Sequence, residues 1–151
     1  MTMANLSKVG LQLPTYTFEV ERVKIKEFVQ AIGDDNPIYQ DKGIAITEGY
    51  RDTPCPPTFV TSAFQEFTGA YFKAFEELGI PLSKVLHGEE EYEYLGEIYP
   101  GDMLLCKMKV ESIVQKETKS GKIDLVTLQT LFTTQTGQEV LRAKSLIIER
   151  R

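Results

Sequence analysis

The chain has 151 residues, 42% of them hydrophobic, and its 8 Phe and 7 Tyr can fill the core of one domain over residues 1–151. Its formal net charge of −5 excludes the strongly basic surface that nucleic-acid binding requires. No apolar run approaches the ~20 residues of a membrane span, and the N-terminal residues lack an apolar signal core. We therefore expect a cytoplasmic protein that binds neither nucleic acid nor membrane.

The side chains that commonly hold metals or act as nucleophiles are scarce. Cys55 and Cys106 are too few for a disulfide framework, and they are expected to be free thiols. His87 is the single histidine, so no Cys/His cluster with zinc spacing exists. Glycine-rich nucleotide loops and the G-x-S-x-G serine motif are absent from the sequence. We expect no metal and no cofactor.

The first predicted elements are a strand and a surface helix. Apolar and polar residues alternate over 16–20, which predicts a strand. The helix is predicted from apolar residues at helical spacing, namely Ile25, Phe28, Val29 and Ile32. Gly33 is expected to end this helix in the left-handed conformation.

A short helix and then a long one are predicted next. Asn36 can cap a short helix with Pro37 in its first turn, whereas three prolines make 51–57 irregular. Residues 58–80 carry wide apolar stripes and predict one helix about 30 Å long, with Thr58 as its N-cap. A helix with so wide an apolar face must be wrapped by something, most simply a curved sheet.

The second half of the sequence predicts that sheet. Residues 89–98 alternate through two tyrosines, and 99–102 form a turn that leads into a strand over 104–111. Two further strands, 123–134 and 140–149, follow tight turns and complete an antiparallel meander. The predicted fold class is α+β, with a long central helix wrapped by a curved antiparallel sheet, as in hot-dog proteins.

Two adjacent carboxylates, Asp34 and Asp35, lie where the first helix should stop. Loop carboxylates at a helix end are commonly solvated or capping groups, and the N-cap role of Asn36 is a complete structural explanation for that residue. Spacing alone therefore makes Asp34 a candidate for acid/base chemistry and Asp35 its exposed neighbour.

The residues around Asp34 resemble the D-x-N-P-x-H signature of the MaoC-like (R)-specific enoyl-thioester hydratases and 3-hydroxyacyl dehydratases. The match runs Asp34-x-Asn36-Pro37-Ile38-Tyr39. Further along, the resemblance includes Ala45, Gly49, the Pro56–Phe59 run, HGEEEYEY at 87–94 and the Tyr-Pro-Gly-Asp turn. It is greatest to the N-terminal-type (FAS1-like) dehydratase domain, which includes the A and C subunits of mycobacterial-type hydroxyacyl-acyl-carrier dehydratases.

One position departs from the signature, because Tyr39 replaces the family's histidine. The resemblance assigns Asp34 to the catalytic aspartate and Asn36 to the supporting asparagine. In a complete site the carboxylate and the imidazole hold one water, which adds across the enoyl double bond. A phenol, with a reference pKa of about 10 against about 6.5 for imidazole, is a poor base at neutral pH. Losing one such partner should cost ~10²–10⁴ in rate, and His87 is expected to be an ordinary strand residue.

The acyl thioester is expected to bind beside the start of the predicted long helix. Backbone N–H groups near Thr58 and Phe59 could polarise its carbonyl, although an N-cap role would also explain Thr58. Because the family places this helix start beside the acyl chain, the substrate-binding candidates are Cys55, Thr58, Phe59 and Ser62. The aromatic stripe Phe64, Phe67, Tyr71 and Phe75 is expected to be mainly core, with part of it lining an acyl tunnel.

The resemblance implies that the missing base comes from another chain. In the most similar dehydratases one subunit lacks the motif histidine and shapes the acyl pocket, while its partner carries the Asp/His pair. We expect this chain to be such an accessory subunit, binding an acyl-CoA or acyl-ACP thioester; isolated chains could still form homodimers. The alternatives are a homodimeric hydratase that uses Asp34, a thioesterase that uses Glu66, and a non-enzymatic acyl-thioester binding module.

Overall fold

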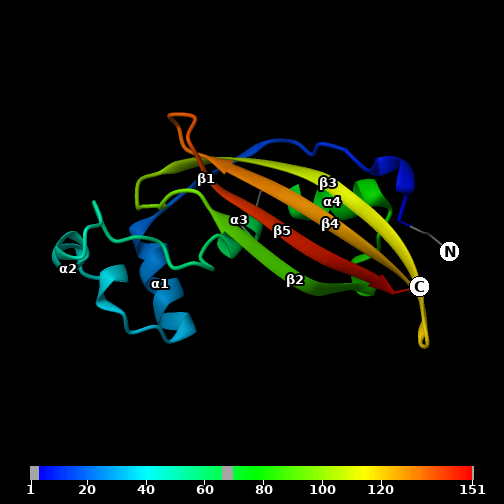
Figure 1. Cartoon of the computed structure of the whole chain (residues 1–151), viewed down its shortest axis with the longest axis horizontal. Coiled ribbons are helices and arrows are strands. Elements are labelled where there is room, and N and C mark those ends of the chain that lie inside the picture. The colour runs from blue at the N-terminus through cyan, green and yellow to red at the C-terminus, as the bar shows by residue number, and fades with distance from the viewer. Residues whose placement is uncertain (1–3, 66–69, 151) are drawn as a thin grey trace.

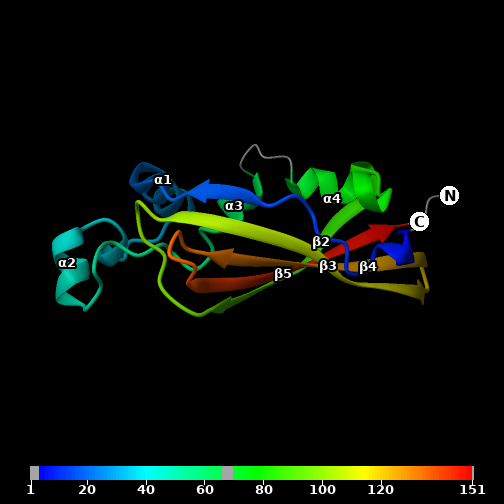
Figure 2. The same cartoon turned by 90° about the horizontal axis from the view of Figure 1, so that it is seen from above.

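A computed structural model describes residues 4–65 and 70–150 of the chain, and it has an α+β architecture (Figures 1 and 2). Its antiparallel sheet has five strands in the order β1-β3-β4-β5-β2. The strands are β1 (Tyr16–Glu19), β2 (Val85–Tyr94), β3 (Met103–Thr118), β4 (Gly121–Thr133) and β5 (Glu139–Arg150). The helices are α1 (Arg22–Ile32), α2 (Lys42–Thr47), α3 (Thr61–Gln65) and α4 (Ala70–Leu78). Three short 3₁₀ helices accompany them: η1 (Leu6–Lys8), η2 (Pro37–Tyr39) and η3 (Leu82–Lys84).

The predicted meander is confirmed, because β3, β4 and β5 pair in succession as antiparallel neighbours. Burial alternates along β4. Every second residue from Asp124 to Phe132 is buried, and the residues between them, from Ile123 to Thr133, point to the opposite, outer face. The helices α3 and α4 lie on one side of the sheet (Figure 2). We call the sheet face that carries the buried residues the inner face. The predicted strand over 89–98 is displaced, since β2 begins at Val85 and ends at Tyr94.

Helix is present at both ends of the predicted 58–80 segment, as α3 and α4. Residues 66–69, and with them Glu66 and Phe67, lie outside the described part of the chain, as do the side chains of Phe64 and Tyr71. The predicted N-cap at Thr58 is wrong, because α3 begins at Thr61. Hydrogen bonds to the third preceding residue form turns before it: the N–H of Phe59 donates to Pro56 O at 3.0 Å and that of Thr61 to Thr58 O at 3.1 Å.

Aromatic side chains join the first strand and helix to the inner face of the sheet. Phe59 is fully buried, with its ring centroid 6.0 Å from that of Phe18 and 5.6 Å from that of Phe28. Ile25 and Val29 of α1 enter the same core as predicted, whereas Ile32 in the last turn is 50% exposed. A second apolar cluster under α4 includes the buried Phe75, as expected for a core position.

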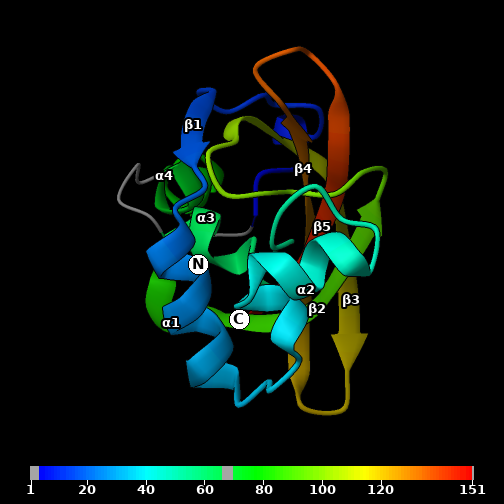
Figure 3. The same ribbon diagram turned by 90° about the vertical axis from the view of Figure 1, so that its left-hand side faces the viewer.

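The segment from α1 to α2 lies at the end of the sheet opposite the two chain termini (Figures 1 and 3). This placement brings the Asp34–Tyr39 segment beside the loops that follow α2 and β2. Within the described residues, no helix has the length and apolar character needed to cross a membrane.

Removing a buried aromatic ring should destabilise the fold far more than removing an exposed one. Phe18 is 1% exposed and Phe72 is 52% exposed. We expect Phe18→Ala to lower the free energy of unfolding by about 3–5 kcal/mol, because the cavity cannot close completely. The matched Phe72→Ala change should alter it by less than about 0.5 kcal/mol. Chemical denaturation of both variants measures the difference, and equal losses would contradict the assigned core.

Candidate functional site

The Asp34–Tyr39 segment is shaped by backbone hydrogen bonds. Gly33 ends α1 with φ of 71°, and the N–H of Asp34 donates to Val29 O at 3.1 Å. Asp34 Oδ1 accepts from the N–H of Asn36 at 2.9 Å, and Asn36 Oδ1 accepts from the N–H of Ile38 at 3.2 Å. The predicted cap at Asn36 is therefore confirmed. Each of these two candidate residues commits one side-chain oxygen to local structure and keeps a second polar atom for other partners.

Tyr39 is held beside Asp34. Its half-buried side chain packs against the core cluster that contains Phe59. Burial is the largest cause that raises the pKa of Tyr39 above its ordinary 10.0, and the negative charges of Asp34 and Glu97 add to it, as does the Tyr50 hydroxyl. The phenol is thus still less able to lose its proton than a free tyrosine.

Cys55 and Tyr94 lie next to this pair. The N–H of Cys55 donates to Ile98 O at 2.9 Å, and the Tyr94 hydroxyl donates to Pro57 O at 2.6 Å. Burial raises the pKa of both side chains, and the charge of Glu97 raises both further. Tyr39 also contributes to the shift at Tyr94, so the two phenols share one environment. The Cys55 thiol and the phenols of Tyr39 and Tyr94 are therefore protonated at neutral pH.

Some backbone N–H groups of the turn before α3 already donate to carbonyl oxygens of the same turn. The N–H of Phe59 donates to Pro56 O, so it is not available to a substrate as the sequence suggested. Among the described residues, the N–H of Thr58 has no hydrogen-bond acceptor, and Thr58 is exposed. Phe59 is buried in the core, while Ser62 is half-buried. Thr58 is thus the predicted substrate contact with a free backbone donor.

His87 lies far from this site. It is seven residues before Tyr94 on β2, which corresponds to about 23 Å along an extended strand at ~3.3 Å per residue. Its Nε2 is instead 2.9 Å from Glu90 Oε1, and the ring is about half exposed. This position agrees with the expected structural role.

Three residues at the site escaped sequence reasoning: Tyr50, Tyr94 and Glu97. They come from the loop that follows α2, the end of β2 and the loop that follows β2, and only the tertiary fold brings them to Tyr39. The alternation of tyrosines along β2 was visible, but nothing local indicated that the Tyr94 hydroxyl would reach Pro57.

Ion pairs anchor the segment that carries the site. Asp52 accepts from Arg22 at the start of α1 at 2.9 Å, and it pairs with Lys42 at the start of α2 at 3.1 Å. The hydrogen bond from Arg22 is the largest cause that holds the pKa of Asp52 well below its usual range. Arg51 pairs with the buried Asp102 at 2.9 Å and lies 4.2 Å from the centre of the Tyr99 ring.

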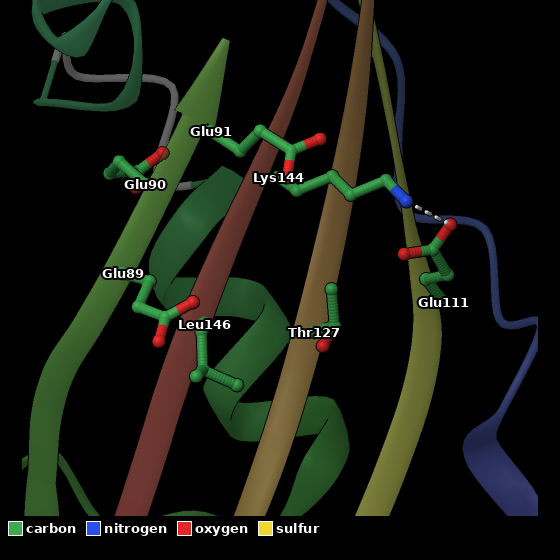
Figure 4. A pocket seen from close by; sticks show the side chains of 7 residues that line it. All are labelled: Glu89, Glu90, Glu91, Glu111, Thr127, Lys144 and Leu146. Atoms are coloured by element: carbon green, nitrogen blue, oxygen red, sulfur yellow. Dashed lines mark ion pairs between the residues drawn. The ribbon is translucent and has the colours of Figure 1, made fainter.

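A surface hollow of about 590 Å³ lies elsewhere, on the outer face of the sheet (Figure 4). It is lined by Glu89, Glu90, Glu91, Glu111, Thr127, Lys144 and Leu146, and it contains none of the candidate site residues. Within residues 4–65 and 70–150, no group of three or more metal-ligating side chains is close enough to hold a metal ion.

Comparison with known proteins identifies a hot-dog protein of a dehydratase family. The FAS1-like dehydratase domain region matches residues 7–143, and the chain belongs to this family. A relative in Thermobifida fusca, a UPF0336 protein, is 33% identical over 133 residues, which is 88% of this chain and 84% of that protein. Another UPF0336 protein, from Streptomyces avermitilis, is 34% identical over 137 residues, covering 91% and 88% of the two chains.

Solved structures confirm the hot-dog fold. The C-terminally truncated HadBC (3R-hydroxyacyl-ACP dehydratase) complex from Mycobacterium tuberculosis superposes with a TM-score of 0.81 at 22% identity, covering 93% of this chain and 96% of that chain. The ChsH1-ChsH2 complex from Mycobacterium tuberculosis superposes with a TM-score of 0.75 at 20% identity, covering 92% and 84%.

The coupling between Asp34 and Tyr39 can be measured directly. In ¹³C-tyrosine-labelled protein, we expect Tyr39 to titrate above its ordinary value of 10.0. Asp34→Asn should lower the pKa of Tyr39, because a neutral side chain no longer opposes formation of phenolate. The matched Asp35→Asn change should leave the titration in place, and an equal response to both substitutions would refute the assigned electrostatic coupling.

Stability should fall at alkaline pH. Burial raises the pKa of Cys106 from 9.0 to about 12, and it raises those of Cys55, Tyr16 and Tyr94 as well. Above about pH 9 the unfolded chain loses these protons before the folded chain does, so the free energy of unfolding decreases as pH rises. Denaturant titrations between pH 8 and pH 11 test this, and stability that does not decline over that range would contradict the burial of these groups.

Proposed function

We propose that this chain is the accessory, substrate-binding subunit of a heteromeric (R)-3-hydroxyacyl-thioester dehydratase, acting in fatty-acid metabolism in the cytoplasm. The observation that carries the proposal is Tyr39, which occupies the motif's histidine position beside Asp34 with a pKa raised above 10.0. The proposed enzyme needs no metal and no cofactor, because its chemistry is acid/base catalysis on an acyl-CoA or acyl-ACP thioester.

The reaction explains why one altered residue matters. Dehydration removes a proton from the carbon next to the thioester carbonyl and returns a proton to the departing hydroxyl group, and hydration reverses both steps. A base and an acid must therefore act on the same substrate. Asp34 could accept a proton, but Tyr39 stays protonated at neutral pH and can only donate a hydrogen bond. The partner subunit would supply the intact Asp/His pair.

This chain would contribute to binding and orientation. The free N–H of Thr58 is suited to receive the thioester carbonyl oxygen, which gains negative charge as the adjacent carbon loses its proton. Cys55, Ser62 and the edge of the Phe59 ring would border the acyl chain. Asn36 would position polar groups near Asp34 through its free side-chain amide.

The relatives support a two-chain arrangement. Two of the similar solved structures are complexes of two proteins, HadBC and ChsH1-ChsH2, and the first is named as a 3R-hydroxyacyl-ACP dehydratase. Their identity to this chain is low, so they support the fold directly and the assembly by analogy. A neighbouring reading frame with an intact D-x-N-P-x-H motif would be the first partner to test.

The chain alone should hydrate crotonyl-CoA poorly, and co-expression with a histidine-containing partner should raise activity above that of the partner by itself. Initial rates, followed as the ultraviolet absorbance of the enoyl thioester disappears, measure this difference. Vigorous turnover by the pure chain would overturn the proposal, and so would a pair that is no more active than the partner alone.

A restored histidine provides a partner-free test of the site. Tyr39→His places an imidazole beside Asp34, and we expect it to raise crotonyl-CoA hydration by the chain alone by at least ~10²-fold. The matched Asp34→Asn/Tyr39→His variant should lose that gain. Equal rates for the two variants would show that Asp34 does not act with residue 39.

A further inference from the structure

The outer face of the sheet is a broad surface that no helix of the described residues covers. Helices α1, α3 and α4 lie on the inner side, and α2 lies beyond one end of the sheet (Figure 2). Strands β2, β5, β4 and β3 run side by side across the outer face. Their outward-pointing side chains include none of the candidate site residues, so contacts made there would leave the candidate site open.

An apolar row crosses this face from β2 to β3. Its members, each directly opposite the next, are Leu86, Ile148, Leu125 and Val114. The two outer members, Leu86 and Val114, are 40% and 46% exposed. An antiparallel sheet that has one face in water usually carries polar side chains on that face. The row therefore has the character of a contact surface.

Carboxylates lie along one side of the face. Glu89, Glu91 and Glu93 point outward from β2, which contains no Lys or Arg. Lys144 lies opposite Glu91 on β5 but extends to Glu111, with Nζ 3.1 Å from that carboxylate (Figure 4). Among the described residues, Glu89 and Glu91 thus form no ion pair.

Lysines lie along the opposite side. Lys107 and Lys109 point outward from β3, and both are exposed. Neither forms an ion pair within residues 4–65 and 70–150. At ~4.8 Å between neighbouring strands, the acidic side on β2 and the basic side on β3 are about 14 Å apart. The outer face therefore has charges of opposite sign along its two sides.

A second copy of this face is complementary to the first in one two-fold arrangement. When the two-fold axis runs parallel to the strands, β2 of each copy lies over β3 of the other. Each residue then faces the far end of its own cross-strand row. The row of Glu91 ends at Lys109, and the row of Glu93 ends at Lys107. Carboxylates therefore meet ammonium groups, and the apolar row lies on its own copy.

The other two-fold arrangement opposes like charges. An axis that runs across the strands places β2 over β2 and β3 over β3. Glutamates then face glutamates and lysines face lysines, which is repulsive. The charges of the face thus select the axis parallel to the strands.

The space between two such faces suits these side chains. Packed sheets lie ~10 Å apart, a distance that one extended Glu and one extended Lys can span together. The hollow of about 590 Å³ beside Glu89 and Glu91 leaves room for lysines that enter from a second copy (Figure 4).

We propose that the outer face of the sheet is a self-association surface, on which a second copy of this chain docks face to face with the two-fold axis parallel to the strands. The apolar row forms the centre of the interface, and Glu91 with Lys109 and Glu93 with Lys107 form its charged rim. This inference goes beyond the proposed function and does not depend on it.

Charge reversal on one side should weaken the association. We expect Lys107→Glu/Lys109→Glu to raise the dissociation constant at least about tenfold, because carboxylates then face carboxylates. Leu125→Lys should do the same, because it places a charge in the apolar row of a central strand. Whatever contacts the chain makes through other surfaces, its assembly mass should fall to half the wild-type value. Sedimentation equilibrium measures both the mass and the constant.

A mixture of two reversed variants should associate again. Glu91→Lys/Glu93→Lys should associate poorly with itself, because lysines then face lysines. Mixed with Lys107→Glu/Lys109→Glu, it restores every opposite-charge pair, and the recovered assembly also shows that both variants are folded.

The matched controls reverse exposed charges on α1 and α4. Lys26→Glu/Lys73→Glu and Glu27→Lys/Glu76→Lys have the same net charges as the two test variants. Each control should associate with itself as the wild type does.

Cross-linking distinguishes the two arrangements. A carbodiimide joins a carboxylate to an amine that it contacts, so it should link Glu91 of one copy to Lys109 of the other in a mixture of ¹⁵N-labelled and unlabelled protein. Mass spectrometry of the digested product identifies the joined peptides. The proposal is overturned if the test variants keep the wild-type mass, if the controls lose it equally, if the reversed mixture does not recover it, or if the links between copies join other faces.

Discussion

The packing of Phe59 between Phe18 and Phe28 is the contact on which the rest of the structure depends. It joins the first strand and helix to the turn before α3, and all three lie against the inner face of the meander. The same core receives the ring of Tyr39 on its surface. The candidate site is therefore a border of the hydrophobic core, and its geometry follows from how that core closes.

Chemistry at this border is asymmetric. Asp34 lies on the segment that leaves α1, and Tyr39 is a phenol whose proton is retained because its surroundings are half-buried and negatively charged. Cys55 and Tyr94 are protonated for the same reasons. The site has two carboxylates, Asp34 and Glu97, beside the protonated phenols and thiol. Under the proposed function, the imidazole that the signature pairs with the aspartate would come from the partner subunit.

Features set by short-range rules could be predicted from the sequence. Strand alternation gave the meander, Gly33 marked the end of α1, and Asn36 with Pro37 marked η2. Features that depend on distant residues could not. The helix starts at Thr61 because the residues before it form turns, with hydrogen bonds to Pro56 O and Thr58 O. Pro57 O, which lies between these two acceptors, accepts from the Tyr94 hydroxyl. Glu97 joins the site from a loop that has no distinctive local pattern.

Asp52 links the starts of α1 and α2 through Arg22 and Lys42. Two helices that flank the Asp34–Tyr39 segment thus share a single carboxylate, while the meander is secured by strand pairing and apolar burial. Contacts of such different kinds give the two regions different sensitivities to their surroundings. Salt screens such exposed ion pairs and should therefore loosen the link between the two helices, whereas Ile25 and Val29 keep α1 packed in the core.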